Sequence, residues 1–345
     1  MIATAALLAA TLSSDAVASP IDAAAFVSPT YEGSASQLRH ALRRPGQTRR
    51  IRRMSFSAQG VDRNCHTQAI SVADDVVMTS CVDRRNQTGW LQIFGRKTDE
   101  PRSFSDVAGL RLVGDRFPHP SVGHAVVKRG QEGRILVPIG REPFDVHGAD
   151  DHSRLEVRDQ DGALVCAIDN DRRGGLAATA LVVSDDHLFA VAVGYTHLLI
   201  WRIDAVDTDG SCVAERMFDA PGLEAAGRRW RRYQGIATIV DRDGDVYLFG
   251  GRQHRLDVWA LRGFGRPDMV VEEVASMEWR PAAMPVRGVF HEGLSVEPRA
   301  DRLRIWAAPR DFWRGTCLPA RAEKRCTPAV YVVEQPLDAP RMSWR

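Results

Sequence analysis

Short apolar runs alternate with polar turns along most of the chain, and one stretch shows the rhythm clearly. In RYQGIATIVDRDGDVYLFGGRQHRLDVWAL, residues 232–261, apolar runs of strand length begin at Ile236, Val246 and Leu256. An Asp-Gly pair between the first two runs is typical of a tight hairpin turn, and glycines with polar residues separate the second run from the third. The stretch therefore predicts three antiparallel strands, a unit that needs neighbours to bury its faces.

The same plan recurs along the chain. Units with this order of strands and turns open 52 to 60 residues apart, at Ile70, Val122, Leu176, Ile236 and Leu294. A fourth, weaker strand follows in most units, as in ALVCAID and VVEEVAS. Four-stranded units of this length, without sustained helical periodicity, are typical of β-propeller blades.

The segments IVDRDGDVYLFGG and LDVWAL resemble the blades of WD40-like and kelch-like propellers. The units are longer than a standard WD40 repeat and lack its Gly-His and Trp-Asp signatures, so the resemblance is to the propeller class and to no single family. We predict an all-β fold, a five-bladed propeller of four-stranded antiparallel blades over residues 51–345. The strand-like residues 53–60 are expected to complete the last blade and close the ring. A large β-sandwich is the alternative.

The N-terminal segment suggests export. MIATAALLAATLSSDAVASP is apolar but too short to span a bilayer, and Ala16-Val17-Ala18 has the small-x-small pattern of a signal-peptidase site. We predict a signal peptide over residues 1–19, with cleavage after Ala18, and a secreted or periplasmic protein without membrane insertion after cleavage. Residues 20–50, rich in Ala, Ser and Arg, are expected to be a flexible lead-in outside the ring.

Six cysteines in an exported chain favour disulfides. The preferred pairs are those that a short turn or loop brings together, Cys65–Cys81 and Cys317–Cys326. Cys166–Cys212 is then the remaining pair, across the outer strands of successive blades. Free buried thiols in a cytosolic protein are the alternative.

Composition adds little about partners. The formal net charge is +2 and 44% of the residues are hydrophobic, enough for one large domain. The sequence resembles no nucleic-acid-binding module, so we expect no nucleic-acid partner, and we expect a monomer. It contains no G-x-S-x-G, HExxH or P-loop motif.

Propeller architecture brings the starts of the innermost strands together at one end of the axis, so aligned residues there form a candidate site. The residue just before each anchor is small, as in Gly235 and Gly293, because the converging backbones need room. The polar residues beside them are predicted to bind a ligand: His119, Arg173, Arg232, Tyr233, Gln234, His291 and Glu292. The alternative is that these residues only pair with one another and with water.

Two loops at the same end extend the candidate site. In REPFDVHGADDHS, residues 141–153, the residues His147, Asp150 and His152 are candidate ligands for zinc or calcium, although no standard metal motif is matched. In GRRWRRYQG, residues 227–235, arginines around a tryptophan favour an anionic partner such as an acidic glycan or a phosphorylated compound. DRDGDV, residues 241–246, resembles the start of a calcium loop but is interpreted as a hairpin turn.

Three functions fit these features. The first is a secreted propeller that binds a small polar or anionic ligand at the mouth of its central channel. The second is an extracellular hydrolase or lyase at the same place, with His291 or His119 as base, Glu292 as acid, and Tyr233 and Arg173 stabilising negative charge. The third is a scaffold that binds another protein through its rim.

Overall fold

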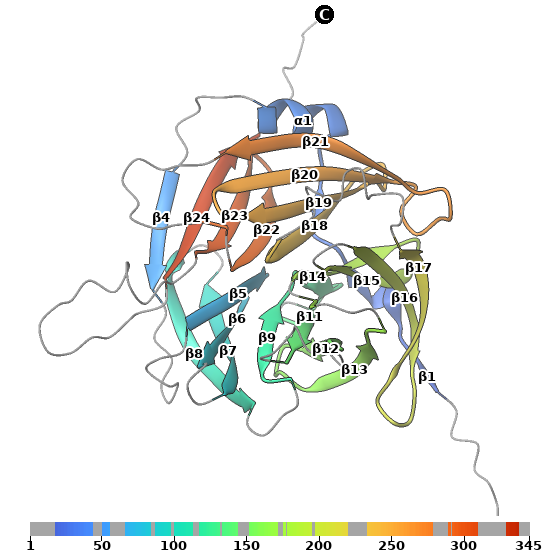
Figure 1. Ribbon diagram of the computed structural model, residues 1–345. Helices are drawn as coiled ribbons and strands as arrows, with labels where there is room; N and C mark the ends of the chain where they lie inside the picture. The colour runs from blue at the N-terminus through green and yellow to red at the C-terminus, as the bar shows by residue number, and fades with distance from the viewer. Residues whose placement is uncertain are drawn as a thin grey trace, which may run out of the picture.

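Antiparallel sheets account for most of the protein. The computed structural model describes residues 18–43, 50–55, 66–83, 87–97, 100–112, 117–131, 133–143, 152–171, 175–176, 178–194, 197–219, 233–278, 289–290, 292–309 and 329–337. Figure 1 shows five sheets around a common axis, with β5, β9, β14, β18 and β22 nearest to it. The chain is therefore a five-bladed β-propeller, and the prediction of its fold is confirmed.

Each blade has four antiparallel strands, which follow one another from the axis outward. Blade 1 contains β5 (His66–Ala73), β6 (Val76–Asp83), β7 (Thr88–Lys97) and β8 (Glu100–Leu112). Blade 2 contains β9 (His119–Val122) and β10 (Val126–Lys128), which share the innermost position, then β11 (Ile135–Glu142), β12 (Arg154–Asp159) and β13 (Leu164–Asp169). Blade 3 contains β14 (Ala178–Ser184), β15 (His187–Val193), β16 (Leu198–Val206) and β17 (Cys212–Asp219).

The last two blades follow the same order. Blade 4 contains β18 (Gly235–Asp241), β19 (Val246–Arg252), β20 (Arg255–Arg262) and β21 (Val270–Glu278). Blade 5 contains β22 (Gly293–Arg299), β23 (Arg302–Ala308), β24 (Ala329–Pro336) and, outermost, β4 (Arg50–Ser55). Because β4 comes from the N-terminal part and pairs with β24, it closes the ring; of the residues 53–60 that were predicted to do so, 53–55 belong to it and 56–60 lie outside the described residues.

The core lies between neighbouring blades. In β19, Val246 and Leu248 pack toward blade 3, whereas Tyr247 and Phe249 pack toward blade 5. Successive side chains of a strand point to opposite faces, and both faces of this strand are covered. Such double burial explains why the inner strands are continuous apolar runs and do not alternate strictly with polar residues.

Residues 19–31 form a segment that we call the N-terminal clasp. It contains β1 (Ser19–Pro20), the 3₁₀ turn η1 (Ala23–Ala25), β2 (Phe26–Val27) and β3 (Thr30–Tyr31). β1 pairs with β16, β2 pairs with the inner edge of β10, and β3 runs parallel to the inner edge of β18. In blade 3, the Val183 amide donates to Ser28 Oγ at 2.7 Å.

The clasp corrects the expectation that residues from 20 onward form a flexible lead-in outside the ring. The innermost strands of a propeller leave backbone groups unpaired on their axial side, and these groups need partners when they are buried. β2 and β3 supply such partners at the end of the axis where β14 and β18 finish, so the segment is part of the folded domain.

Helix α1 (Ala35–Arg43) continues from the clasp and packs on the outside of blades 4 and 5 (Figure 1). A capping box begins it: the Ser34 amide donates to Gln37 Oε1 at 2.8 Å, and the Gln37 amide donates to Ser34 Oγ at 3.4 Å. Leu38 and Leu42 are fully buried against the core. In the part of the chain that the structure describes, no helix has the length and apolar character needed to cross a membrane.

Candidate ligand-binding site

The upper end of the propeller, as we call it, is the end at which β5, β9, β14, β18 and β22 begin. The antiparallel register places the last residues of each second strand beside these starts, so Glu142 of β11 lies opposite His119 of β9. Predicted site residues in the described part of the chain are His119, Tyr233, Gln234 and Glu292, and these all lie at or just before inner strands. Arg173, Arg232 and His291 lie outside the described residues.

Backbones of neighbouring inner strands are in close contact at this end, as the small residues predict. A Cβ on Gly235 would lie 2.5 Å from the backbone nitrogen of Leu294, and a Cβ on Gly293 would lie 2.6 Å from Cα of Ala69. Both distances are too short for any side chain, because the opposing atoms belong to backbone. The packing explanation for these glycines is confirmed.

Below this level, hydrogen bonds between blades cross the axis. The fully buried His124, which follows β9, contacts the Val296 carbonyl of blade 5 through Nε2 at 2.9 Å. The Thr238 amide of blade 4 donates to His124 Nδ1 at 3.2 Å. Because a backbone amide can only donate, Nδ1 is the acceptor and Nε2 carries the proton that is donated to Val296. Burial lowers the pKa of His124 to about 4, against the smaller opposing effect of the hydrogen bond to Val296.

A second interblade contact joins blades 1 and 5 at the axis. The Val72 amide donates to Ser295 Oγ at 3.0 Å, and both groups are buried. Together with His124 and the clasp, this contact places bonded protein groups along the middle and lower parts of the axis.

His119 and Glu142 form the most informative couple at the upper end. His119 Nδ1 lies 3.5 Å from Glu142 Oε2, and the side chains are 16% and 5% exposed. No described residue donates a hydrogen bond to the other oxygen, Oε1, although it is buried. Buried polar atoms in native proteins are normally satisfied, so this oxygen calls for a donor from outside the described residues.

Glu142 was missing from the predicted site. The predicted site included only residues that precede or begin the inner strands, and Glu292 is the acidic residue among them. Glu142 lies instead at the end of a second strand. The hairpin register between β9 and β11 is the signal that finds it, because that register places residue 142 opposite residue 119.

Tyr233 has a different environment from the one predicted. It is almost fully buried, and its hydroxyl donates to Asp257 Oδ2 at 2.5 Å and accepts from Trp259 Nε1 at 3.2 Å. Burial and then the Asp257 carboxylate raise the pKa of Tyr233. The ring lies against Gly250, where a Cβ would be 2.7 Å from it. Tyr233 therefore packs inside the protein, and we leave it out of the proposed site.

The remaining polar residues are held by their backbones at the upper end. Glu292 is 7% exposed, and its amide donates to the Ala308 carbonyl at 3.0 Å. The half-buried Gln234 donates its amide to the Gly251 carbonyl at 3.4 Å. Gln68 of β5 is also 7% exposed. These amides and carboxylate add acceptors and donors to the same end of the propeller.

The structure describes one of the three candidate metal ligands. His147 and Asp150 lie outside the described residues, and His152 is exposed with Nδ1 at 3.1 Å from the Asn170 carbonyl. Within the described ranges, no three His, Cys, Asp or Glu residues are grouped as metal ligands. At the lower end, Asp241 Oδ1 accepts from the amides of Asp243 and Asp245, so the interpretation of DRDGDV as a hairpin turn is confirmed.

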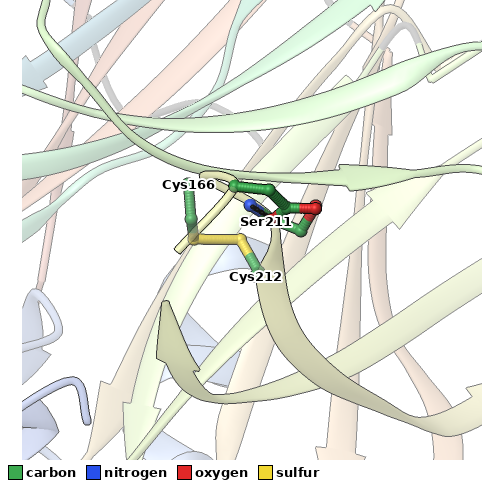
Figure 2. The surroundings of a disulfide bond; sticks show 4 residues. Cys166, Ser211 and Cys212 are labelled. Carbon is green, nitrogen blue, oxygen red and sulfur yellow. Dashed lines mark hydrogen bonds between the residues drawn. A yellow bond between two sulfur atoms is a disulfide. The ribbon is translucent and has the colours of Figure 1, made fainter. Parts of the chain in front are cut away.

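A disulfide joins Cys166 of β13 to Cys212 of β17, across the outer strands of blades 2 and 3 (Figure 2). It confirms the third predicted pair. Cys81 is also disulfide-bonded, while Cys65, Cys317 and Cys326 lie outside the described residues. A disulfide of this kind is typical of an oxidising compartment.

No protein-family model and no curated protein matches the sequence. Among solved structures, an exo-β-1,3-galactanase from Clostridium thermocellum is similar, with 8% identity and a TM-score of 0.49 over 85% of this chain and 63% of that one. An α-L-arabinofuranosidase from Lactobacillus brevis has 7% identity and a TM-score of 0.46 over 80% and 92% of the two chains. The Dos1 propeller has 11% identity and a TM-score of 0.31 over 78% and 68%. These likenesses are too distant to support an activity, and the fold assignment rests on the strand topology.

Proposed function

We propose that this protein is an exported β-propeller that binds a small polar ligand at the upper end of its axis. The observation that carries the proposal is the His119–Glu142 couple, a buried carboxylate with one oxygen that no described residue satisfies. Gln68, Gln234 and Glu292 are polar residues at the same end. Several polar residues at one end of the propeller axis support a binding site there.

Export is supported by two independent features. The Cys166–Cys212 disulfide is typical of proteins outside the reducing cytosol. The apolar N-terminal segment with its small-x-small pattern is typical of a signal peptide. Appearance of the protein in culture medium or periplasm, with Ser19 as its first residue, is the expected result of expressing residues 1–345.

A thermal-shift screen tests binding. The purified protein, with its disulfides intact, is mixed with neutral and acidic glycans, phosphorylated metabolites, calcium and zinc. A ligand at about one hundred times its dissociation constant adds about 2.7 kcal/mol to the free energy of unfolding, which gives a measurable shift. His119→Ala should abolish that shift, whereas His187→Ala, at an exposed turn at the lower end, should retain it. Equal shifts in both variants would refute the location of the site.

The same couple favours a hydrolase or lyase as the second candidate. The 3.5 Å between His119 Nδ1 and Glu142 Oε2 is longer than a hydrogen bond, but couples in which histidine acts as general base are often this long without substrate and shorten when it binds. Slow conversion of a bound compound, detected by chromatography and lost in His119→Ala, would establish this activity. Binding without conversion would leave the protein as a binding protein, and silence across the screen would direct attention to a protein partner at the rim.

A further inference from the structure

Glu142 carries a carboxylate that the described residues leave incompletely paired. Oε2 is 3.5 Å from His119 Nδ1, beyond a normal hydrogen bond, and the buried Oε1 has no described donor. A buried charged oxygen without a hydrogen bond is destabilising compared with the same oxygen in water. Its retention at the upper end is explained if something that binds there supplies the missing donor.

The neighbouring arginine does not supply it. Arg141 is fully buried, its Nε donates to the Phe117 carbonyl at 2.7 Å, and its Nη1 contacts both oxygens of Glu156 at 3.1 and 3.2 Å. Successive residues of a strand point to opposite faces, so the guanidinium of Arg141 is directed away from the Glu142 carboxylate. These bonds also hold the end of β11, and they keep the backbone of Glu142 in place.

Gly175 shapes the position of this carboxylate. A Cβ at residue 175 would lie 1.7 Å from Glu142 Oε1 and 2.5 Å from Cδ, so any other residue would displace the side chain. The opening of blade 3 therefore leaves room for the carboxylate of blade 2. A glycine at this position serves the placement of Glu142, besides any requirement of the backbone.

We propose that Glu142 makes the upper end selective for a neutral polyhydroxylated ligand, a carbohydrate, whose hydroxyl group donates to Oε1. This inference rests on the proposed function and specifies its ligand class. A hydroxyl is a hydrogen-bond donor, and a sugar carries several adjacent hydroxyls that can lie beside the polar residues of the same end. A carboxylate or phosphate on the ligand would instead face the charges of Glu142 and Glu292.

Two matched sugar series test the charge preference. The probes are glucose, glucuronate and glucosamine, and galactose, galacturonate and galactosamine, each titrated to 100 mM by ligand-observed NMR. The variants are Glu142→Gln, which keeps the shape but removes the charge, and Gly175→Ala, which keeps the charge but displaces it. Glu215→Gln, on the outer strand β17 and 60% exposed, is the matched control.

The neutral sugar of at least one series should bind at least 10-fold more tightly than its uronate and at least as tightly as its amino sugar. Glu142→Gln and Gly175→Ala should each weaken that binding at least 10-fold, and Glu215→Gln should leave it unchanged. Without ligand, Glu142→Gln should melt at the same temperature as the parent protein or higher. If the carboxylate had a purely structural role, its removal would lower the melting temperature.

Other outcomes overturn the inference in separable ways. Equal or tighter binding of a uronate shows an anion site, and preference for an amino sugar shows a cation site. Unchanged sugar binding in both variants removes Glu142 from the site. If neither series binds while another compound gives a shift that depends on His119, the carbohydrate class is wrong and the proposed function stands. If no compound binds in a manner that depends on His119, both fail.

Discussion

The buried histidine at the axis makes stability depend on pH. His124 accepts from the Thr238 amide and donates to the Val296 carbonyl, which joins blades 2, 4 and 5. Adding a proton to Nδ1 would place its N–H against the Thr238 N–H and would put a charge in a fully buried position. Burial accordingly lowers the pKa of His124 from 6.5 to about 4.

The pKa shift gives the size of the effect. The folded pKa lies below the unfolded one, so the unfolded chain takes up the proton first as pH falls. The contribution of His124 is complete above pH 6.5, decreases by about 1.4 kcal/mol per pH unit below it, and is lost once the pH passes about 4. Over this window the folded state loses about 3 kcal/mol of stability relative to the unfolded chain.

Urea unfolding from pH 7.5 to pH 4, followed by tryptophan fluorescence, compares the parent protein with His124→Gln. At pH 7.5 the variant should be less stable by about 1–3 kcal/mol, because a buried hydrogen-bond partner is lost. The difference should shrink by about 3 kcal/mol toward pH 4, where the variant equals or exceeds the parent. His187→Gln, at an exposed turn, should follow the parent curve. Parallel curves for the parent and His124→Gln would refute the reasoning.

Three further changes test the fold. Gly293→Ala should destabilise by about 1–3 kcal/mol in urea because its Cβ meets backbone at 2.6 Å, whereas Gly194→Ala, whose Cβ would lie 3.2 Å from the Gly175 carbonyl oxygen, should cost less; equal behaviour would contradict the blade packing. Replacing Cys166 and Cys212 with serine frees a loop with a sequence separation of 46 and should cost about 4 kcal/mol, seen as a lower urea midpoint; an unchanged midpoint would count against the disulfide. Leu38→Ala should lower the free energy of unfolding by about 2–5 kcal/mol if α1 packs on the core. An unchanged free energy of unfolding would instead support the prediction that this segment is a flexible lead-in.

The blades could be predicted because their information is local. In blade 4, the Asp-Gly turn at residues 243–244 and the apolar runs beside it specify a hairpin without reference to distant residues. The repetition of that plan then specified the ring. The Cys166–Cys212 pair was predicted only as the remainder after the two preferred pairs, and the structure explains it because β13 and β17 lie side by side.

The clasp and α1 could not be predicted in this way because their partners are distant in sequence. Phe26 and Val27 are two apolar residues in an Ala- and Ser-rich segment, too few to indicate a strand, and they pair with β10. Leu38 and Leu42 are one helical turn apart, but the surface that covers them belongs to blades 4 and 5. The short apolar runs are visible in the sequence, but the strand edges and surfaces with which they pair are not.

The end of the propeller at which the candidate residues lie could be predicted from the sequence, whereas the directions of their side chains could not. Aligned position specifies where a backbone lies, and so His119 and Glu292 lie at the upper end as expected. It does not specify side-chain direction. Tyr233 turns inward over Gly250 to reach Asp257, a path that opens only because residue 250 has no side chain.

Closure of the ring by β4 and the clasp also determines when the protein can finish folding. β4 must wait for β24, so a loop of about 270 residues has to close, at an entropic cost of about 5 kcal/mol. Pairings so distant in sequence form late and slowly. β4 is synthesised before the blades, so it remains without its partner until β24 has been made, and the ring closes only then.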